Sequence, residues 1–469
     1  MQDSSKNKKR KILMDCIAAI STPAASGGVS MIRISGEDAF EVAKKVFSPK
    51  FPQSDIDKMQ GYTASYGDIL KDGQKIDDGI LLIFRAPHSY TGENVAEITC
   101  HGGIYITRLV LECCLSAGAR MAGAGEFTKQ ALINGKMSLT EAEAVIDLIN
   151  AGSEQLITCA KAQSEGALYR RIEGLCEDII KVTSEIAVWI DYPDESEDED
   201  EISKADWLAE ISVLKGKMDN LLETYDSGQV MREGITVAIA GKPNAGKSTL
   251  MNLLTGVQKS IVTDIEGTTR DIVEETVMLG DIILHLSDCA GIRETSDTVE
   301  NIGVQKMLQR LDTSQLILAL FDSSKPLSDE DYRFIDIIKG RNIIPVINKS
   351  DLDTAIDVNY IEDNLGKSVV LSAKMGEGLD TLEKAVREKC NIKKLDPSAG
   401  FLANERQRQC ALSAAGAVDN AYNALLSGMT ADVAGLELET ALSQLYELSG
   451  KSASEEVIAR IFERFCVGK

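Results

Sequence analysis

A glycine-rich turn between an apolar run and a helical stretch constrains this chain more than any other segment. The turn, Gly241-Lys-Pro-Asn-Ala-Gly-Lys-Ser-Thr249, follows the apolar residues 235–240 and precedes leucines at helical spacing. Its glycines let backbone N–H groups face a phosphate chain, Lys247 can reach the β and γ phosphates, and the Ser248 hydroxyl can bind magnesium. A chance match to the fixed positions has a probability on the order of 1–2% in a chain of this length. The segment therefore predicts a P-loop nucleotide site.

Three later motifs, each placed after an apolar run, match the remaining parts of a guanine-nucleotide switch in the required order. Asp288-Cys-Ala-Gly291 places a carboxylate beside the metal and a glycine N–H where the γ-phosphate would lie. In Asn348-Lys-Ser-Asp351, the last carboxylate can accept both N–H groups of the guanine edge, whereas adenine would leave it unpaired. Ser372-Ala-Lys374 would support the base. The set therefore predicts GTP rather than ATP as the ligand.

The composition limits the class of protein. At 469 residues the chain can hold roughly two to four domains. Its 50 basic and 73 acidic residues give a net charge of −23, so contact with RNA needs a local basic patch or a partner protein. Ten cysteines without paired metal-binding spacing, two of them adjacent at Cys113 and Cys114, indicate reduced thiols in a cytosolic (cytoplasmic) compartment. We expect no membrane span and no secretory signal, because no apolar run is long enough and none follows the basic opening 6–11.

The order of apolar patterns predicts a multidomain α/β plus α protein. Residues 1–136 mix strand and helix patterns and predict an N-terminal α+β domain. Helical patterns fill residues 137–231 and 391–469, on either side of the nucleotide motifs in 232–390. The economical interpretation is one helical domain in two sequence pieces, with a Ras-like P-loop G domain inserted between them.

Three polar features allow more than one interpretation. His101, which precedes a glycine pair, is more often a structural residue at a tight turn than a ligand, and three histidines are too few to favour a histidine metal centre or triad. The acidic run 191–201 is interpreted as a solvated loop between helices rather than a cation site. Cys466, just beyond the last apolar helical pattern, is either a small buried residue or a thiol presented on a short tail.

With these residues in place, residues 15–469 resemble the MnmE (also called TrmE) family, GTPases of tRNA wobble-uridine modification. The most specific feature is the ending Cys466-Val-Gly-Lys469. A generic translational or ribosome-assembly GTPase shares the nucleotide motifs but not this tail or this N-terminal domain. The other segments that carry the resemblance are Gly27-Gly-Val-Ser-Met-Ile-Arg33-Ile-Ser-Gly36, Thr91-Gly-Glu93 before Glu97, His101-Gly-Gly103 and Gly125-Glu-Phe-Thr128.

The resemblance implies a one-carbon site in residues 1–136. In this family the N-terminal domain dimerises and binds 5-formyl- or 5,10-methylene-tetrahydrofolate, and the matching positions are Arg33, Glu97 and Lys136. The terminal Lys469 is expected to approach the same pocket. A pterin offers N–H groups to a carboxylate such as Glu97, and its glutamyl tail suits cations.

In the G domain, the resemblance implies a different route to hydrolysis from that of Ras. Ile292 stands where Ras-like proteins carry a water-orienting glutamine, and the family's catalytic candidate matches Glu300. A potassium ion is expected to replace the arginine finger. We expect Ser248 and Thr269 to bind magnesium, and Asn244, Thr263, Ile265 and Thr268 to bind potassium.

The full set of positions expected around the nucleotide spans the P-loop, both switches and the base-binding motifs. The set is Asn244, Ala245, Gly246, Lys247, Ser248, Thr249, Thr263, Asp264, Ile265, Gly267, Thr268, Thr269, Asp288, Cys289, Ala290, Gly291, Asn348, Lys349, Asp351, Ser372, Ala373 and Lys374. Two positions depart from the family pattern. Cys289 replaces the usual threonine, and Ser26 stands where an arginine near the folate domain is common.

The resemblance therefore implies a homodimeric, potassium-dependent GTPase that works with an FAD-dependent partner resembling MnmG. Together they would add an aminomethyl or carboxymethylaminomethyl group at C5 of uridine 34 in certain tRNAs. Folate would supply the carbon, the flavin the redox step, and glycine or ammonia the nitrogen, with Cys466 close to the reacting centre. The alternative is a ribosome-assembly or regulatory switch GTPase without modification chemistry.

Overall fold

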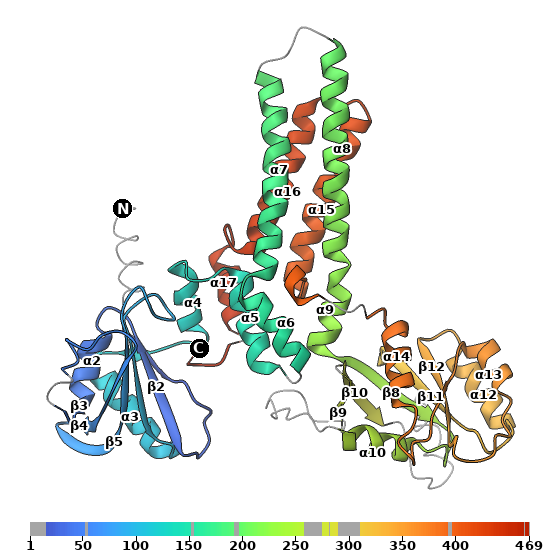
Figure 1. Ribbon diagram of the computed structural model, residues 1–469, viewed down its shortest axis with the longest axis horizontal. Coiled ribbons are helices and arrows are strands. Elements are labelled where there is room, and N and C mark those ends of the chain that lie inside the picture. Colours follow the sequence, from blue (N-terminus) through green and yellow to red (C-terminus); the bar gives the residue numbers. More distant parts are fainter. Residues whose placement is uncertain are drawn as a thin grey trace. The chain divides into compact units, whose positions relative to one another are not determined.

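The chain forms two compact units, of which the first is built from two segments that are distant in sequence (Figure 1). Unit 1 combines Met1–Ile146 with Tyr446–Lys469, and unit 2 comprises Asp147–Leu445. The computed structural model describes residues 16–51, 55–151, 154–191, 197–257, 274–280, 282–288, 310–392, 396–463 and 465–468.

Unit 1 is built on a mixed sheet whose described strands run in the order β3-β4-β5-β6-β2-β1-β7. In β6, Ala96, Ile98 and Cys100 are buried in one apolar core. They alternate with the polar residues Glu97, Thr99 and His101, as expected for a strand with one apolar face. Helices α2 (Ala39–Val46) and α3 (Ile104–Ser116) pack on that face. The strands are β1 (Ile17–Ile20), β2 (Val29–Ser35), β3 (Phe47–Pro49), β4 (Thr63–Lys71), β5 (Gln74–Phe84), β6 (Val95–His101) and β7 (Arg120–Met121).

The carboxyl-terminal segment packs within unit 1. Helices α4 (Glu126–Ile133) and α5 (Leu139–Asn150) follow the sheet, and α17 (Glu455–Phe462) returns from the carboxyl end. Phe462 and Phe465 of the returning segment pack on Ala142 in a small apolar core. The terminal helix is therefore part of the folded unit.

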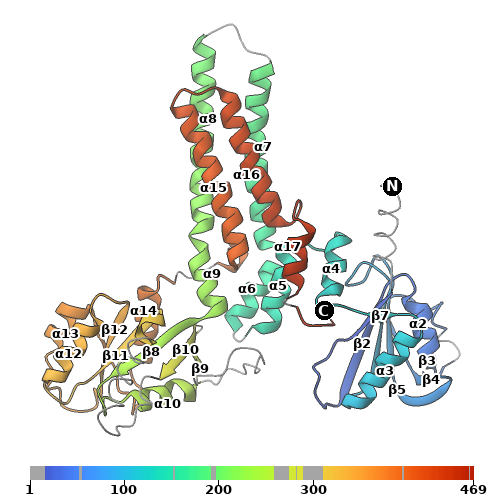
Figure 2. The same ribbon diagram turned by 180° about the vertical axis from the view of Figure 1, so that it is seen from behind.

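The helical part of unit 2 is a bundle made from both sequence pieces. Helices α7, α8, α15 and α16 lie side by side in both ribbon views (Figure 2). Buried alanines such as Ala414 and Ala421 on α15 let the helices approach closely. The helices are α6 (Glu154–Ser164), α7 (Ala167–Asp191), α8 (Glu197–Leu222), α9 (Thr224–Glu233), α15 (Glu405–Leu426) and α16 (Ala431–Ser449), with the 3-10 turn η1 (Pro397–Ala399) before α15.

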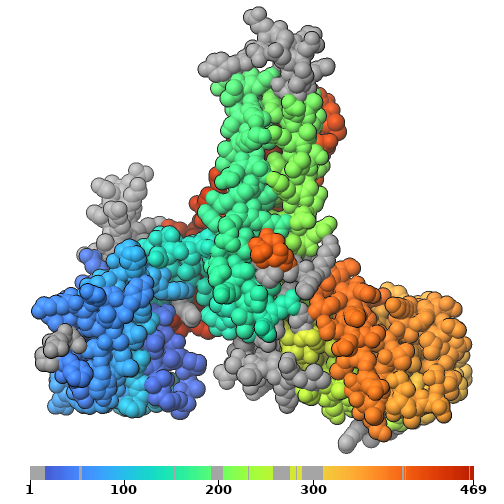
Figure 3. All heavy atoms as spheres, viewed as in Figure 1, coloured from blue at the N-terminus to red at the C-terminus, as the bar shows by residue number. Residues whose placement is uncertain are grey.

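The segment that returns from the G domain to the helical bundle is held by side chains of the first piece, which donate hydrogen bonds to its backbone carbonyls. Gln163 Nε2 donates to the carbonyl of Phe401 at 2.6 Å, and Arg171 Nη1 donates to that of Gly400 at 2.8 Å. Figure 3 shows this orange segment near residue 400 set among the green helices of the first piece. The prediction of one helical domain in two pieces, interrupted by a G domain, is confirmed.

The inserted G domain has a sheet whose described strands follow the order β13-β12-β11-β8-β10-β9. All neighbours pair in parallel except β9 and β10. The central strands β8, β11 and β12 are mostly apolar, as expected for a sheet with an apolar core on each face. The elements are β8 (Ile235–Gly241), α10 (Lys247–Val257), β9 (Glu274–Leu279), β10 (Ile282–Asp288), β11 (Leu316–Asp322), α12 (Asp329–Ile338), β12 (Ile343–Asn348), α13 (Val358–Leu365), β13 (Val369–Val370) and α14 (Leu379–Lys389).

One expectation from the sequence is wrong. The acidic run 191–201 was expected to be a loop, but α8 already begins at Glu197. Acidic residues are favourable in the first turn of a helix because the helix dipole is positive there. Among the described residues, none of the helices is long and apolar enough to cross a membrane.

The contact between Gly125 and the returning segment should contribute strongly to the stability of unit 1. Gly125 has φ +62, and a Cβ there would lie 2.7 Å from Phe462 Cδ1 and 2.8 Å from Phe465 Cβ. We expect Gly125→Ala to lower the free energy of unfolding by about 2–4 kcal/mol, since it adds both backbone strain and overpacking. Chemical denaturation of the full chain measures this loss.

Gly135 supplies a matched control for that substitution. Its φ of +67 is similar, but nothing lies within 4 Å of a Cβ at this position. Gly135→Ala should therefore cost only the strain, about 1 kcal/mol. Equal losses in the two variants would show that the contact with the phenylalanines contributes nothing.

Candidate functional site

The nucleotide motifs converge because parallel strands end at the same edge of a sheet. Gly241 at the end of β8 is level with Leu320 of β11, and Asp322 of β11 is level with Asn348 of β12. Asp288, at the end of β10, is level with Ile239 of β8. The carboxyl edge of a parallel sheet is the usual place for a ligand site in folds of this kind. The structure therefore brings the P-loop, the second switch motif and the base motif to one edge.

The P-loop adopts a backbone conformation that its glycines and Asn244 make possible. Gly246 has φ +101, and a Cβ there would lie 2.1 Å from Asn348 Nδ2. Asn244 has φ +64, in the left-handed region that asparagine tolerates better than most residues. Lys247 Nζ donates to the carbonyls of Gly241 and Lys242 at 2.6 and 2.8 Å. The ammonium group therefore lies over the loop in which a phosphate chain would be bound.

Asn348 joins the P-loop to the loop that supports the base. The residue is 2% exposed. Its Nδ2 donates to the carbonyl of Ala245 at 2.9 Å, and its Oδ1 accepts from the backbone N–H of Ala373 at 3.0 Å. Leaving a buried amide group unpaired costs about 1–3 kcal/mol, so these two bonds fix the loops relative to each other.

Asp351 is oriented by the motif that follows it in the sequence. Ser372 Oγ donates to Asp351 Oδ1 at 2.7 Å. This hydrogen bond holds the pKa of Asp351 below its ordinary value, so the carboxylate is ionised at neutral pH. An exposed, ionised and oriented carboxylate is what recognition of the guanine N–H groups requires.

Asp322 is a site residue that the sequence reasoning missed. Its Oδ2 lies 2.6 Å from Lys349 Nζ, and the two side chains are 13% and 30% exposed. Burial acts to raise the pKa of Asp322, but hydrogen bonds from Lys349 and Ser324 outweigh it and hold that pKa below the ordinary value. The signal available in the sequence was a carboxylate directly after the apolar run 316–321.

Several predicted site residues lie outside the described part of the chain. They include the catalytic candidate Glu300 and most of both switches. The structure describes the backbone of Asp288 but not its side chain. The undescribed positions are Thr263, Asp264, Ile265, Gly267, Thr268, Thr269, Cys289, Ala290, Gly291, Glu300 and Lys469.

In unit 1, two of the three predicted folate residues form a pair on the sheet face opposite α2 and α3. Arg33 Nε lies 2.7 Å from Glu97 Oε1, and the side chains are only 16% and 12% exposed. The Arg33 guanidinium also lies 5.5 and 5.6 Å from the ring centroids of Tyr90 and Phe127. The third residue, Lys136, instead donates from Nζ to the carbonyl of Pro87 at 3.1 Å. The structure therefore joins Arg33 to Glu97 and ties Lys136, which follows α4, to the loop that carries Pro87 and Tyr90.

The carboxyl-terminal tail lies against the same part of unit 1. The N–H of Gly125 donates to the carbonyl of Cys466 at 3.3 Å, and Ser21 Oγ donates to that of Gly468 at 3.0 Å. Among the described cysteines, Cys466 is the exposed one. In contrast, burial raises the pKa of Cys16 to about 12, which makes that thiol inert. Cys466 is therefore a presented thiol and not a small core residue.

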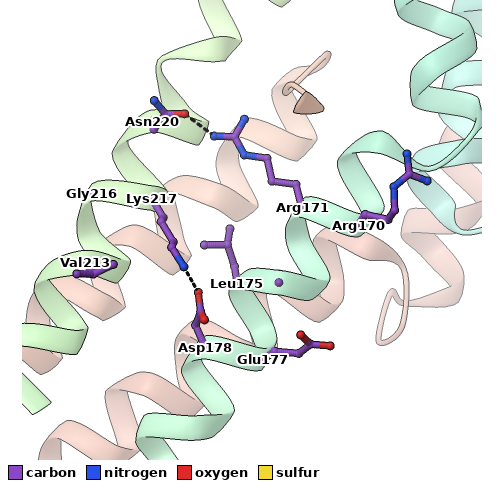
Figure 4. A pocket seen from close by; sticks show the side chains of 10 residues that line it. Arg170, Arg171, Leu175, Glu177, Asp178, Val213, Gly216, Lys217 and Asn220 are labelled. Carbon is purple, nitrogen blue, oxygen red and sulfur yellow. Dashed lines mark hydrogen bonds and ion pairs between the residues drawn. The ribbon is translucent and has the colours of Figure 1, made fainter. Parts of the chain in front are cut away.

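A pocket of about 590 Å³ between α7 and α8 carries three cations but has the properties of a structural contact. Lys217 donates to Asp178, and Arg171 donates to the side-chain oxygen of Asn220 as well as to a backbone carbonyl (Figure 4). Burial lowers the pKa of Arg171. Because these partners already bind Lys217 and Arg171, this pocket is a weaker candidate for a ligand site than the nucleotide edge of the G domain or the sheet face around Arg33.

Two family models together match nearly the whole chain. The model for the GTP-binding protein TrmE N-terminus matches residues 16–136. The model for the MnmE helical domain matches residues 139–466.

Individual relatives match at nearly full length. A protein of Acetivibrio thermocellus, named tRNA modification GTPase MnmE, is 38% identical over 460 residues, covering 97% of this chain and 99% of the relative. One from Lactobacillus delbrueckii subsp. bulgaricus with the same name is 39% identical over 460 residues, covering 97% of this chain and 98% of that relative. Among solved structures, the G domain of the T. maritima FeoB iron transporter is 28% identical, covers 33% of this chain and 98% of that one, and has a TM-score of 0.26.

The Asp322 and Lys349 pair gives a test of the nucleotide edge. Asp322→Asn leaves the Lys349 ammonium without its carboxylate at the start of the base motif. We expect guanine-nucleotide affinity to fall by about tenfold, since a charge-assisted hydrogen bond that orients the motif is lost. Titration with a fluorescent GDP analogue measures the change. Asp329→Asn, at an exposed position in the first turn of α12, is the control; equal affinities in the two variants would contradict the role of Asp322.

Proposed function

The chain belongs to the MnmE family of tRNA modification GTPases, and from this premise we propose that it hydrolyses GTP to drive modification of the wobble uridine in certain tRNAs. The observation that carries the proposal is the guanine edge of the G domain. There Asn348 ties the P-loop to the base loop, and Ser372 orients Asp351. This arrangement supports selection of guanine, and the phosphates would then lie over the P-loop.

Hydrolysis would use residues on both sides of the γ-phosphate. Lys247 would neutralise phosphate charge, and Ser248 with Thr269 would hold magnesium. Because Ile292 has no group to orient water, Glu300 would position the attacking water. When bound, a potassium ion beside the β and γ phosphates offsets the charge that develops there.

Asn244 supports the potassium part of this proposal. Its backbone has φ +64 at the bend of the P-loop. Its side-chain amide oxygen is a suitable ligand for a hard cation. The other proposed ligands are Thr263, Ile265 and Thr268, and completing the ion's shell would bring two G domains together in a homodimer.

The face around Arg33 fits a reduced folate. Arg33 occupies one oxygen of Glu97, and among the described residues Oε2 of Glu97 has no hydrogen-bond partner. This oxygen can accept from the N–H groups of a pterin, and Lys136 and Lys469 would attract its glutamyl tail. When bound, the folate supplies a one-carbon unit. The residues present therefore fit 5-formyl- or 5,10-methylene-tetrahydrofolate.

The remaining chemistry requires a partner. An FAD-dependent protein of the MnmG kind would supply the redox step, and glycine or ammonia the nitrogen. The net charge of −23 fits this division of labour, because a partner with basic surface can bring the tRNA to a negative protein. Cys466 would act near the reacting carbon, since the tail that presents it contacts Gly125, two residues from the Phe127 ring beside Arg33.

Potassium should stimulate GTP turnover by the purified protein. We expect the rate in potassium to exceed that in sodium by about tenfold or more, because the smaller cation does not fill the charge-offsetting site well. Steady-state phosphate release at matched ionic strength measures this ratio. Asn244→Ala should remove most of the difference while GDP affinity is kept. Equal rates in sodium and potassium for the unchanged protein would rule out the potassium site.

Deletion of the gene should remove the C5 substituent from uridine 34, because the proposed GTP-driven step would then be missing. Mass spectrometry of tRNA nucleosides from the deletion strain measures this. A plasmid copy of the unchanged gene should restore the substituent, and one with Cys466→Ser should not, although its GTP turnover is normal.

Cys390→Ser is the control for loss of a thiol, since Cys390 is half-buried in the G domain. It should restore modification fully. Modification that persists in the deletion strain would reject the proposed function, whereas full restoration by Cys466→Ser would reject only the role of the thiol.

A further inference from the structure

His285 connects the strand pair β9 and β10 to the end of helix α9, and we propose that this contact passes nucleotide-dependent movement from the G domain to the helical bundle. The inference rests on the proposed function, because it concerns regulation by the same nucleotide site. It assigns a positioning role to a residue that does not touch the nucleotide.

The hydrogen bonds of His285 span three elements. Its Nε2 lies 2.7 Å from the carbonyl oxygen of Glu233, the last residue of α9. Since a carbonyl only accepts, Nε2 must carry the hydrogen. Its Nδ1 lies 3.0 Å from Thr276 Oγ1 on β9, and in the neutral ring it accepts from that hydroxyl. One imidazole therefore joins β10, β9 and α9.

Both free ends of this strand pair lead to segments expected to contact the γ-phosphate. β9 begins at Glu274, shortly after Thr269, the expected magnesium ligand of the first switch. β10 ends at Asp288, the first residue of the second switch motif. A displacement of the switches that depends on the γ-phosphate would therefore act on the strands that hold Thr276 and His285.

The backbone between α9 and β8 packs closely against β10. Gly234 follows α9 with φ +75. A Cβ at Gly234 would lie 2.7 Å from the carbonyl oxygen of Ile283 and 3.0 Å from His285 Nε2. The end of α9 and β10 are therefore in close backbone contact, so movement of one element must displace the other.

Other residues of α9 bind to both sequence pieces of the helical domain. Arg232 Nε lies 2.6 Å from Asp147 Oδ1 on α5, and Arg232 Nη1 donates to the carbonyl of Ala403 at 3.3 Å. Tyr225 Oη donates to Glu405 at the start of α15 at 2.9 Å. A shift of α9 would therefore change contacts with helices that precede the G domain in sequence and with helices that follow it.

A pocket that is partly open to solvent lies beside α9. Its volume is about 200 Å³, and it is lined by Asp147, Cys159, Gly228, Arg232 and Phe401, among others. Close-packed interiors resist gradual deformation, whereas an open pocket next to one helix leaves that helix space for a second packing. The His285 contact and the ion pair of Arg232 with Asp147 thus link the G domain through α9 to the helical bundle, and the pocket leaves space for α9 to move.

Hydrogen exchange of the full-length protein tests this connection. Amide exchange in residues 224–233 is compared with GDP and with a non-hydrolysable GTP analogue bound. We expect a difference between the two nucleotides in the unchanged protein, and in His285→Ala that difference should shrink about threefold or more because the donor to Glu233 is gone. His285→Gln, which keeps an N–H at a similar reach, should restore most of it.

Ser287→Ala is the matched control, because Ser287 lies on the same strand and its hydroxyl bonds to the Val237 carbonyl within the sheet. It should leave the difference unchanged. An unchanged difference in His285→Ala, or no difference in the unchanged protein, would overturn the inference.

Two further readouts separate this inference from the proposed function. In His285→Ala, GTP turnover should stay within about twofold of normal while tRNA modification falls, since the residue is outside the nucleotide site. Nucleotide-dependent exchange in α9 without any tRNA modification by the unchanged protein would reject the proposed function and leave the inference standing. Equal losses of turnover and modification in His285→Ala would assign His285 a purely structural role and reject the inference.

Discussion

The nucleotide site depends on one buried side-chain amide. Asn348 uses its donor on the P-loop carbonyl of Ala245 and its acceptor on the N–H of Ala373, so a single planar group sets the distance between the phosphate loop and the base loop. Neither loop has regular structure to hold it in place, and both must be fixed before their N–H groups can bind a ligand at low entropic cost. The pair of Asp322 and Lys349 and the bond from Ser372 to Asp351 then position the charged groups around that frame.

The same use of main-chain carbonyls explains how a helical domain remains intact when a G domain interrupts it. Side-chain donors from the first piece, Gln163 and Arg171, bind the carbonyls of Phe401 and Gly400 where the chain returns. At the outgoing crossing, His285 binds the carbonyl of Glu233. Closing a loop of this length costs little more than closing a short one, so a few well-placed bonds suffice to hold both crossings. These bonds also allow movement of the G domain to be transmitted to the helical domain at the two connecting segments.

The sequence predicted what depends on local pattern and on strand order. Apolar runs followed by Gly241, Asp288 and Asn348 sufficed to bring the nucleotide motifs to one edge, because parallel strands end together. It did not predict Asp322, whose role arises only when β11 lies beside β12 and Lys349 reaches across. Nor did it predict that α8 begins inside an acidic run, where the helix dipole outweighs the bias of acidic stretches toward solvated loops. The positions of Glu300 and Thr269 stay predictions, since both lie outside the described residues.

The form of the carboxyl-terminal motif follows from how the tail is bound. The backbone makes the contacts: the carbonyl of Cys466 accepts from Gly125, Val467 pairs with Ala124, and the carbonyl of Gly468 accepts from Ser21. Gly468 has φ +105, and a Cβ there would lie 2.2 Å from the carbonyl oxygen of Ile20, so only glycine fits. Since main-chain groups make these contacts, the thiol of Cys466 is not needed for them and stays exposed. A tail built this way fixes where its cysteine lies without burying the sulfur, which is the condition a reactive thiol needs.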